Sequence, residues 1–563
     1  MNITQLIFQN ARKFPYRKAI IAPLSYDKCD RIAYTHYTFE QFVHHSQVLS
    51  QRLSKLGVKA GTRTLLFVKP SIDFPLVVFS LFSLGAVPIL IDPGVGRKNL
   101  LAAISKVQPE VLIAEPMVHY MRRFFPKAFA SIRISITTQG PSFFTSRLSL
   151  QHMIIRDASQ SPRSVYIDVD EHAPAAIVYT SGATGIPKGV IYTHRMFYHQ
   201  VKLLKEILPR TGHDIDLSCF PLFSLFAIAM GMTSVIPWLD AGKPATADPQ
   251  LLLRHIQDHG TTLASGSPAI WQRLADFCVE KKIQLPSLRG IMMFGAPIAL
   301  QLHEKMQSIL PNGTTYTPYG ATESLPVSWI SGRSILANFG ERSRRGEGTC
   351  IGKVVPTTEA RIIKTSFEVI AKYDEAKELA PNEVGELIVS GEQVTREYFA
   401  HREETLRSKI NDGQRIWHRM GDLAYKDNEG FIWFCGRKVH QVVSDGQIFY
   451  SINCEAIFNQ HPQVRRSALI AYQIADAIRP AIVLERKDRK AELPGQELTK
   501  FNSELLLLAK AHPHTRAIAT FFLHQDFPVD CRHNIKIDRI YLGQFFSRKK
   551  KAKATHAREA NEV

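Results

Sequence analysis

The most informative stretch of this chain is Tyr179-Thr-Ser-Gly-Ala-Thr-Gly-Ile-Pro-Lys-Gly-Val190. The apolar residues 175–179 before it predict a strand that ends in a loop of small residues. The glycines of the loop permit unusual backbone dihedrals, its hydroxyl groups are hydrogen-bond donors, and Lys188 adds a positive charge. Because successive backbone N–H groups in such a loop can surround an oxyanion, the stretch predicts an anion-binding loop.

This loop differs from a Walker A loop, in which a glycine and four further residues are followed by Gly-Lys. Here Gly182 and four further residues are followed by Pro187, so a proline stands where the Walker A loop has the glycine before its lysine. A flexible loop without a ligand is the alternative, but the preceding strand and the density of donors favour anion binding. The candidate ligands are Thr180, Ser181, Gly182, Thr184, Gly185 and Lys188.

Further short motifs follow along the chain. They are Gly295-Ala-Pro297 after a predicted strand at 290–294, Tyr319-Gly-Ala-Thr-Glu323, Gly421-Asp-Leu423, Gly436-Arg-Lys438 and His533-Asn-Ile-Lys-Ile-Asp-Arg539. The second motif combines an aromatic face, a hydroxyl and a carboxylate, a set that suits a magnesium nucleotide. Each motif alone is compatible with an ordinary turn or cap.

Taken together and in this order, the motifs resemble those of the adenylate-forming superfamily of acyl-CoA synthetases, peptide-synthetase adenylation domains and luciferases. The resemblance covers about residues 30–540. It implies an α/β fold, with a large N-terminal domain of several subdomains and a smaller, mobile C-terminal α+β domain. It also implies an enzyme that joins a carboxylate to AMP, with ATP and Mg²⁺ as cofactors.

The resemblance assigns roles residue by residue. Gly295, Ala296 and Pro297 would contact adenine, and Tyr319, followed by Gly320, would stack on it. Thr322 would contact phosphate and Glu323 would hold Mg²⁺.

The later motifs supply the remaining roles. Asp422 would bind the ribose hydroxyls, Arg437 would lie near the ribose at a hinge, and Lys536 would enter the site for adenylation. The expected catalytic residues are therefore Lys536, Thr322 and Glu323. No general base is needed for this step, because a carboxylic acid is already ionised at neutral pH.

The chain departs from the superfamily pattern at two places. Ala183 stands where a Ser or Thr is usual, which predicts reshaped ATP handling. At the hinge, coenzyme A ligases usually carry Gly-Arg-x-(Lys/Asp)-Asp with a Gly-Gly pair after it, whereas this chain has Val439 and no doubled glycine. The departure at the hinge argues against the thioester-forming half-reaction with coenzyme A.

A narrower resemblance accounts for these departures. Segments 90–96, 317–326, 417–422 and 527–534 are similar to the β-lactone synthetases of bacterial long-chain olefin biosynthesis. Such enzymes adenylate a 3-hydroxy fatty acid, whose own hydroxyl then closes a four-membered lactone and expels AMP. This resemblance implies a long-chain acyl substrate, no need for coenzyme A, and other olefin-pathway enzymes as partners.

Two alternatives remain open at this point. One is a long-chain fatty-acid coenzyme A ligase, the only case in which coenzyme A would be a cofactor. The other is a non-catalytic protein that binds acyl groups or nucleotide. For the acyl chain, the apolar stretch 220–238 supplies a candidate wall of Phe220, Phe223, Phe226 and Met230, with ordinary core packing as the alternative.

Composition sets further limits. The chain has 563 residues, 45% apolar and 21% charged residues and a net charge of +19, which is compatible with a globular enzyme of more than one domain. No nucleic-acid-binding motif accompanies the charge, so we expect a solvated basic surface and no nucleic-acid partner. Seven cysteines without a CxxC pattern indicate a reducing compartment, and we expect a cytoplasmic protein with peripheral membrane contact as an option.

The pattern of elements predicts the domain limits. An AMP-binding domain is expected over residues 1–436 and a compact α+β domain over 437–546, with a disordered basic tail over 547–563. Within them we expect helices at 38–56, 452–459 and 497–511, and strands at 64–68, 314–317, 467–472, 481–484 and 520–523. Residues 74–91 are expected to form a buried helix that ends near Gly85 and then a short strand.

Overall fold

The computed structural model describes residues 2–138, 146, 148–155, 166–180, 187–474, 477–489, 492–529 and 536–548. The chain divides into two compact units. The first is Met1–Val327, Val355–Thr358 and Ser390–His418, and the second is Ser328–Val354, Glu359–Val389 and Arg419–Val563. This division falls inside two strands, β15 (Ser324–Ser331) and β20 (Arg415–Lys426). The domain limits expected from the sequence, with a boundary after residue 436, stay a prediction.

The first unit contains a seven-stranded sheet with the order β7-β6-β5-β3-β4-β8-β9. Its strands are β7 (Leu148–Ser149), β6 (Ile134–Thr137), β5 (Val111–Ala114), β3 (Arg63–Phe67), β4 (Val87–Ile91), β8 (Pro174–Thr180) and β9 (Lys188–Thr193). All neighbours are parallel except β8 and β9, which are antiparallel. The strands on either side of residues 181–187 are therefore hydrogen-bonded to each other.

A second series of paired strands in this unit has the order β14-β13-β12-β10-β11-β1-β2. The strands are β14 (Thr314–Ala321), β13 (Gly290–Met293), β12 (Leu263–Gly266), β10 (Ile215–Ser218), β11 (Thr233–Val235), β1 (Lys18–Tyr26) and β2 (Ile32–Thr38). They are parallel from β14 to β1, and β2 returns antiparallel. Their carboxyl ends therefore meet at one edge, where ligands bind in open α/β sheets.

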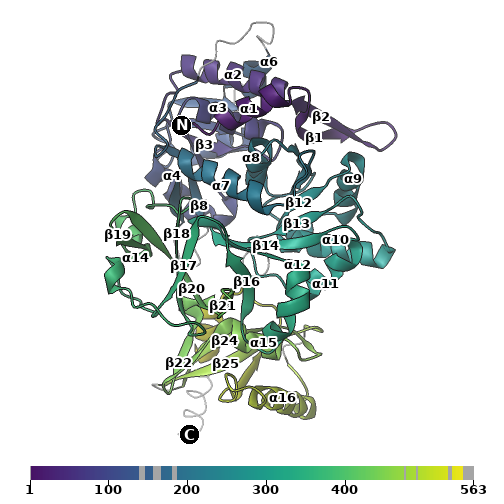
Figure 1. Ribbon diagram of the computed structural model, residues 1–563, viewed down its shortest axis with the longest axis vertical. Helices are drawn as coiled ribbons and strands as arrows, with labels where there is room; N and C mark the ends of the chain where they lie inside the picture. Colours follow the sequence, from purple (N-terminus) through teal and green to yellow (C-terminus); the bar gives the residue numbers. More distant parts are fainter. Residues whose placement is uncertain are drawn as a thin grey trace. The chain divides into compact units, whose positions relative to one another are not determined.

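Local sequence explains several helices of this unit, which are placed in Figure 1. In α2 (Phe39–Lys55), Thr38 and Gln41 form a reciprocal capping box. In α3 (Asp73–Ser83), every residue from Phe74 onward is buried, as expected for a helix that is apolar on all sides. The other helices are α1 (Gln5–Lys13), α4 (Arg97–Val107), α5 (Pro116–Met121), α6 (Leu150–Ile155), α7 (His194–Ile207), α8 (Pro221–Ala229), α9 (Pro249–His259), α10 (Pro268–Lys281), α11 (Leu300–Ile309) and α14 (Arg402–Ser408).

The second unit begins within β15 and has a mainly antiparallel first layer. Its strands are β16 (Thr349–Val354), β17 (Thr358–Ile363), β18 (Gly385–Gly391), the later part of β20 and β21 (Ile432–Arg437), with the short helices α12 (Gly332–Ser334) and α13 (Gly340–Arg344). Ile330, Phe339, Leu423 and Trp433 belong to its apolar core. This layer places the segments around Asp422 and Arg437 on adjacent strands.

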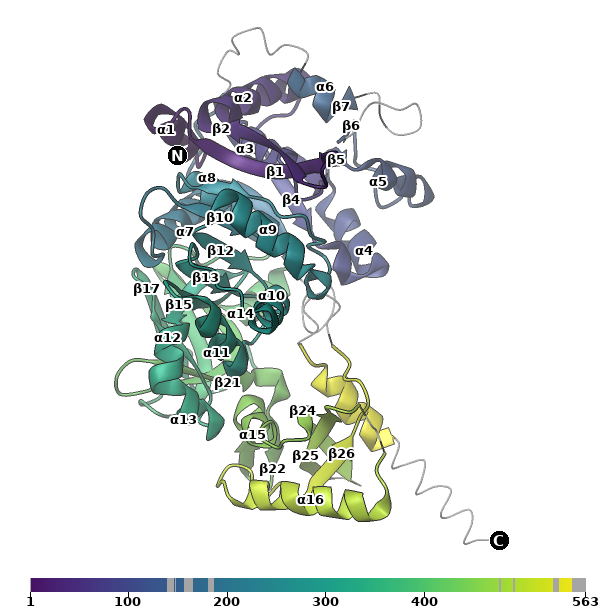
Figure 2. The same cartoon turned by 90° about the vertical axis from the view of Figure 1, so that its right-hand side faces the viewer.

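The remainder of the second unit is built on the sheet β24-β25-β26, shown in Figure 2 with α16 lying along it. The elements are the hairpin β22 (Val442–Ser444) and β23 (Gln447–Phe449), α15 (Ser451–Phe458), β24 (Val464–Ile474), β25 (Ala477–Arg486), α16 (Gly495–Lys510) and β26 (Thr520–Leu523). Alternate residues of β24 face two separate cores, as the two-residue period of a strand requires. Leu469 packs with Phe501 of α16, whereas Ile470 packs with Phe546 of the helical segment 539–548.

The α/β fold class predicted from the sequence is confirmed, and the expected helices and strands are present with small shifts of their ends. Strand β14 differs, because it continues past the expected end at residue 317 to Ala321. Residues 547 and 548 of the predicted tail close the helical segment, and its other residues lie outside the described ones. Within the described part, no helix is long and apolar enough to cross a membrane.

Candidate active site

Lys188 is the first residue of β9 and lies opposite Thr180 in the register with β8. Its amine is 2.5 Å from Oε2 of Glu404 and 5.4 Å from the ring centroid of Tyr398. Both partners belong to the segment that follows β18. Ser181, Gly182, Thr184 and Gly185, which were expected to bind phosphate with Lys188, lie outside the described residues.

Thr322 and Glu323 form the two-residue connection between β14 and β15. The chain turns so tightly here that a Cβ atom on Gly320 would lie 2.6 Å from the carbonyl oxygen of Ser324. Glycine is therefore required at position 320. Thr322 and Glu323 are consecutive residues directly after β14, whereas Tyr319 lies within that strand.

The carboxylate of Glu323 has a buried hydrogen-bond partner. Tyr398 is only 6% exposed, and its hydroxyl donates to Oε1 of Glu323 over 2.7 Å. Burial and the neighbouring charge of Glu323 raise the pKa of Tyr398 well above its usual value. The tyrosine therefore stays protonated and remains a donor at neutral pH.

Lys409 is a buried lysine close to this pair. Its amine donates to the carbonyl oxygen of Thr395 at 2.5 Å and to the hydroxyl of Thr395 at 3.0 Å. Burial lowers the pKa of Lys409 to about 7, and the nearby negative charge of Glu323 acts in the opposite direction. The charge of this amine is thus sensitive to its surroundings near neutral pH.

Gly295, Ala296 and Pro297 follow the carboxyl end of the parallel strand β13. Gly295 has a φ of +94°, a left-handed conformation that favours glycine. The preceding residue, Phe294, has its ring centroid 5.6 Å from that of Phe220 and 6.3 Å from that of Phe223. The residue before the segment expected to contact adenine therefore packs against aromatic residues at the start of α8.

The predicted acyl-wall residues lie on or beside α8. Phe226 packs on Phe223, with 6.1 Å between ring centroids, and on Phe197 of α7 at 5.9 Å. Phe223 and Met230 are buried, whereas Phe220 and Phe226 are partly exposed. These contacts define an aromatic cluster beside the 295–297 segment, and the assignment of an acyl pocket to it stays a prediction.

Asp422 and Arg437 face each other across β20 and β21 in the second unit. Nε of Arg437 lies 3.1 Å from Oδ1 of Asp422, which is buried. Gly421, directly before Asp422, has a φ of +67°, so the motif again needs its glycine. The structure thus brings together the two residues that the sequence assigned to the ribose.

The hinge segment continues from Arg437 into a short 3₁₀ helix, Lys438–His440. The amine of Lys438 lies 2.7 Å from Oε1 of Glu386, and Nη2 of Arg419 lies 2.6 Å from Oε2 of the same carboxylate. Glu386 and Arg419 are buried, whereas Val439 is 43% exposed. Val439, which departs from the coenzyme A ligase pattern, therefore directly follows a lysine that belongs to this buried ion-pair network.

Lys536 is exposed, and the residues after it are firmly held within the second unit. Ile537 forms a β-bridge with Val529. Both Nε and Nη2 of Arg539 lie 2.6 Å from the carboxylate oxygens of Glu455 on α15. This ion pair, in which Glu455 is buried, holds the backbone near Lys536, and the lysine itself is exposed.

The sequence profile of AMP-binding enzymes matches residues 7–399 of this chain. The chain belongs to the AMP-binding enzyme family. An olefin beta-lactone synthetase of Xanthomonas campestris pv. campestris is 37% identical over 548 residues, which cover 96% of this chain and 96% of the relative. Another from Stenotrophomonas maltophilia is 36% identical over 90% of this chain and 91% of the relative.

A solved structure of the family gives the same fold. The O-succinylbenzoate coenzyme A synthetase of Bacillus subtilis, in complex with ATP and a magnesium ion, matches with a TM-score of 0.71 and 22% identity. The match covers 95% of this chain and 99% of that chain. The likeness establishes the fold of this chain.

Sequence reasoning missed the residues of this AMP-binding chain that surround Glu323. Tyr192, Tyr398, Glu404 and Lys409 belong to no short pattern, and their contacts join residues far apart in the chain. The one local signal was the apolar Ile410 directly after Lys409. A buried lysine is rare, but its burial becomes visible only in the fold.

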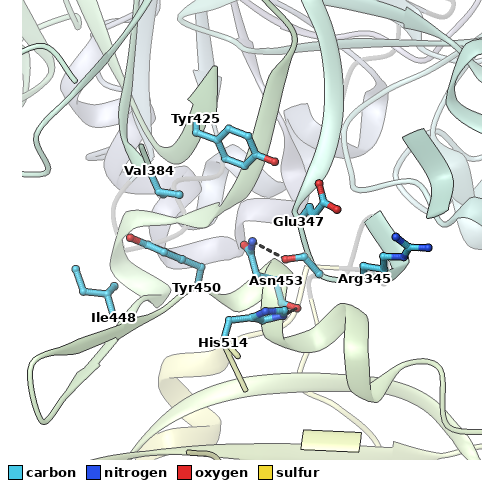
Figure 3. Close-up of a pocket in the computed structure, with 9 residues that line it drawn as sticks. Arg345, Glu347, Val384, Tyr425, Ile448, Tyr450, Asn453 and His514 are labelled. Carbon is cyan, nitrogen blue, oxygen red and sulfur yellow. Dashed lines mark hydrogen bonds between the residues drawn. The ribbon is translucent and has the colours of Figure 1, made fainter. Parts of the chain in front are cut away.

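A pocket of about 320 Å³ lies within the second unit, shown in Figure 3. Tyr425, Tyr450 and His514 line it, and Nδ2 of Asn453 donates to the carbonyl oxygen of Gly346 at 2.8 Å. None of the predicted site residues lines this pocket.

Proposed function

We propose that this enzyme adenylates a long-chain 3-hydroxy fatty acid with ATP and Mg²⁺ and then closes a β-lactone. In the first step a carboxylate oxygen attacks the α-phosphorus of ATP and pyrophosphate leaves. In the second step the 3-hydroxyl oxygen attacks the acyl carbon, the bond from that carbon to the AMP oxygen breaks, and the hydroxyl proton passes to water. The identity of 37% over 96% of both chains to an olefin beta-lactone synthetase carries this proposal.

The residues of this chain would act mainly by positioning and by charge. Two anions must meet in the first step, so cationic groups and oriented donors lower its barrier. Lys188 and the 180–185 loop would receive the phosphates, Tyr319 and the 295–297 segment the adenine, and Asp422 the ribose. Lys536 would complete the charge set at the reacting phosphate.

The donor set of the first unit fits a magnesium ion that is held chiefly by nucleotide. Mg²⁺ usually takes one or two carboxylates together with substrate phosphates and water. The described residues contain no cluster of three metal-ligating side chains, and Glu323 supplies a single carboxylate beside Thr322. When bound there, Mg²⁺ would neutralise part of the phosphate charge.

Product analysis tests this function. The enzyme is incubated with ATP, Mg²⁺ and a long-chain 3-hydroxy acid, with and without coenzyme A, and the products are identified by mass spectrometry. We expect AMP, pyrophosphate and a β-lactone at equal yield in both samples. The matched control is the same acid without its 3-hydroxyl, which should release pyrophosphate but give no lactone.

A thioester that forms only with coenzyme A would replace this function by that of an acyl-coenzyme A ligase. Absence of pyrophosphate release with every acid would leave a non-catalytic binding protein. Contact with other olefin-pathway enzymes and with a membrane surface stays a prediction.

A further inference from the structure

The hairpin that carries Thr322 and Glu323 is held at three consecutive residues. Tyr192 donates its hydroxyl hydrogen to the carbonyl oxygen of Thr322 at 2.6 Å. The backbone N–H of Thr395 donates to the carbonyl oxygen of Glu323 at 2.8 Å, and Ser324 forms a β-bridge with Val394. The backbone of the hairpin is therefore fixed by β9 and by the segment after β18.

The side chain of Glu323 is held separately from its backbone. Among the described residues, the hydroxyl of Tyr398 is the hydrogen-bond donor to this carboxylate, and it uses Oε1. The second oxygen, Oε2, accepts no hydrogen bond from the described residues. Within the described part of the chain, Oε1 is therefore bonded to the protein and Oε2 is not.

Tyr398 is itself held through both its backbone and its ring. Its backbone pairs with Val190 in a β-bridge, and its N–H donates to the hydroxyl of Thr405 at 3.1 Å. The amines of Lys188 and Lys409 lie 5.4 Å and 6.0 Å from its ring centroid. A cation within about 6 Å of an aromatic face attracts it, so the ring has little freedom to rotate away.

We propose that Tyr398 is a positioning residue that orients the Glu323 carboxylate for the magnesium–nucleotide complex. The inference rests on the proposed function, in which Glu323 holds Mg²⁺. By binding Oε1, the tyrosine fixes the carboxylate in one orientation and leaves Oε2 for the metal. Partners of this kind, which bind a metal ligand and not the metal, typically change metal affinity by about 10–100-fold when removed.

The test measures binding of the metal–nucleotide complex to the full-length enzyme, with Mn²⁺ as a paramagnetic substitute for Mg²⁺. Tyr398→Phe should weaken binding of Mn·ATP about 10-fold, measured by electron paramagnetic resonance, and leave the affinity for metal-free ATP in EDTA unchanged. A purely structural role would weaken both affinities together.

Tyr34→Phe is the matched control. The hydroxyl of Tyr34 also donates to a carboxylate, Oδ2 of Asp258 at 2.9 Å, in the same unit but in none of the proposed site segments. This variant loses the same type of hydrogen bond and should bind Mn·ATP as the wild type does. Unchanged Mn·ATP affinity in Tyr398→Phe would overturn the proposal.

Two further variants separate the effect of Tyr398 from effects on folding. Glu323→Asp keeps the tyrosine but shortens the acid by one methylene, so it should lose the same Mn·ATP affinity. In a Glu323→Gln background, Tyr398→Phe should cause no further loss, because its effect passes through the carboxylate. Wild-type affinity of Glu323→Asp, or additive losses in the double variant, would overturn the proposal. The lactone assay is independent of these measurements, so failure of the proposed function would be seen separately.

Discussion

At the scale of single residues, two charged groups of the site, Lys188 and Asp422, are paired with opposite charges inside their own unit. Lys188 is paired with Glu404 in the first unit, and Asp422 is paired with Arg437 in the second. Because Asp422 is buried, its ion pair offsets part of the desolvation that burial imposes on a carboxylate. A nucleotide that used these residues would rearrange existing pairs and would not meet isolated charges.

Lys536 gives the sharpest prediction at this scale. Lys536→Ala should reduce ATP–pyrophosphate exchange by about 10²–10³-fold, the usual loss for one preorganised charge at a reacting centre. ATP binding should stay near the wild-type value, because the adenine, ribose and phosphate contacts are carried by other residues. Lys500→Ala, on the exposed face of α16, is the control and should leave exchange unchanged. An intact exchange rate in Lys536→Ala would mean that the C-terminal motif has been assigned wrongly.

At the scale of elements, the parallel strands β10 and β12 enclose a buried acid. Ser218 and Ser265 donate hydrogen bonds to Oδ2 of Asp216, at 2.5 Å and 3.2 Å. Burial raises the pKa of Asp216 to about 7, and the two serine hydrogen bonds act against this shift. The folded unit therefore holds this proton more tightly than the unfolded chain does.

The pH dependence of stability follows from that difference. Between the unfolded pKa near 4 and the folded pKa near 7, the native state binds more protons, so the stability contribution of Asp216 falls as pH rises. Asp216→Asn removes the titration. Its stability relative to the wild type should increase by about 2–3 kcal/mol between pH 5 and pH 8, at about 1.4 kcal/mol per pKa unit. Urea unfolding curves at both pH values check this, and a pH-independent difference would contradict it.

Elements were predictable where the determining interactions are local. The capping box of Thr38 and Gln41 lies within one helical turn, and the apolar run of α3 reveals its own burial. Strand β14 was expected to end early because its glycine indicated a turn. In the fold, β15 pairs back on it after two residues, so the strand continues through Tyr319 to Ala321.

The site residues that stand in short motifs were predictable from the local sequence, whereas those that folding brings together were not. Glu323 and Asp422 stand in short motifs, whereas the contact of Tyr398 with Glu323 joins residues 75 positions apart. No periodicity or turn signal reports such a pairing before the chain is folded. The burial of Lys409 is likewise a product of tertiary packing.

At the scale of the whole molecule, the cores are separate. Residues between 442 and 546 form two apolar clusters of their own, on either side of β24 and β25. Trp433 and Phe339 belong to a different cluster, in which Tyr450 is a partly buried contributor. The predicted change of domain near residue 437 stays a prediction.

The net charge of +19 gives a prediction for the intact chain. We expect weak, sequence-independent retention of duplex DNA or RNA at about 0.05 M salt and none at about 0.15 M, because only phosphate contacts would contribute. A gel-shift titration at both salt concentrations measures this. Binding that persists at the higher salt and discriminates between sequences would show a nucleic-acid site that the sequence motifs do not indicate.

The Lys188–Glu404 pair has a consequence for which anions the loop admits. Glu404 is a counter-ion attached to the protein, always present at high local concentration, whereas a dissolved anion must be bound from solution. Acetate or chloride brings one negative charge, no more than the carboxylate it would displace, and pays the entropy of association in addition. A polyphosphate brings several charges and can replace Glu404 with a net electrostatic gain. We therefore expect Lys188 to exchange Glu404 for a highly charged nucleotide more readily than for a common monovalent anion.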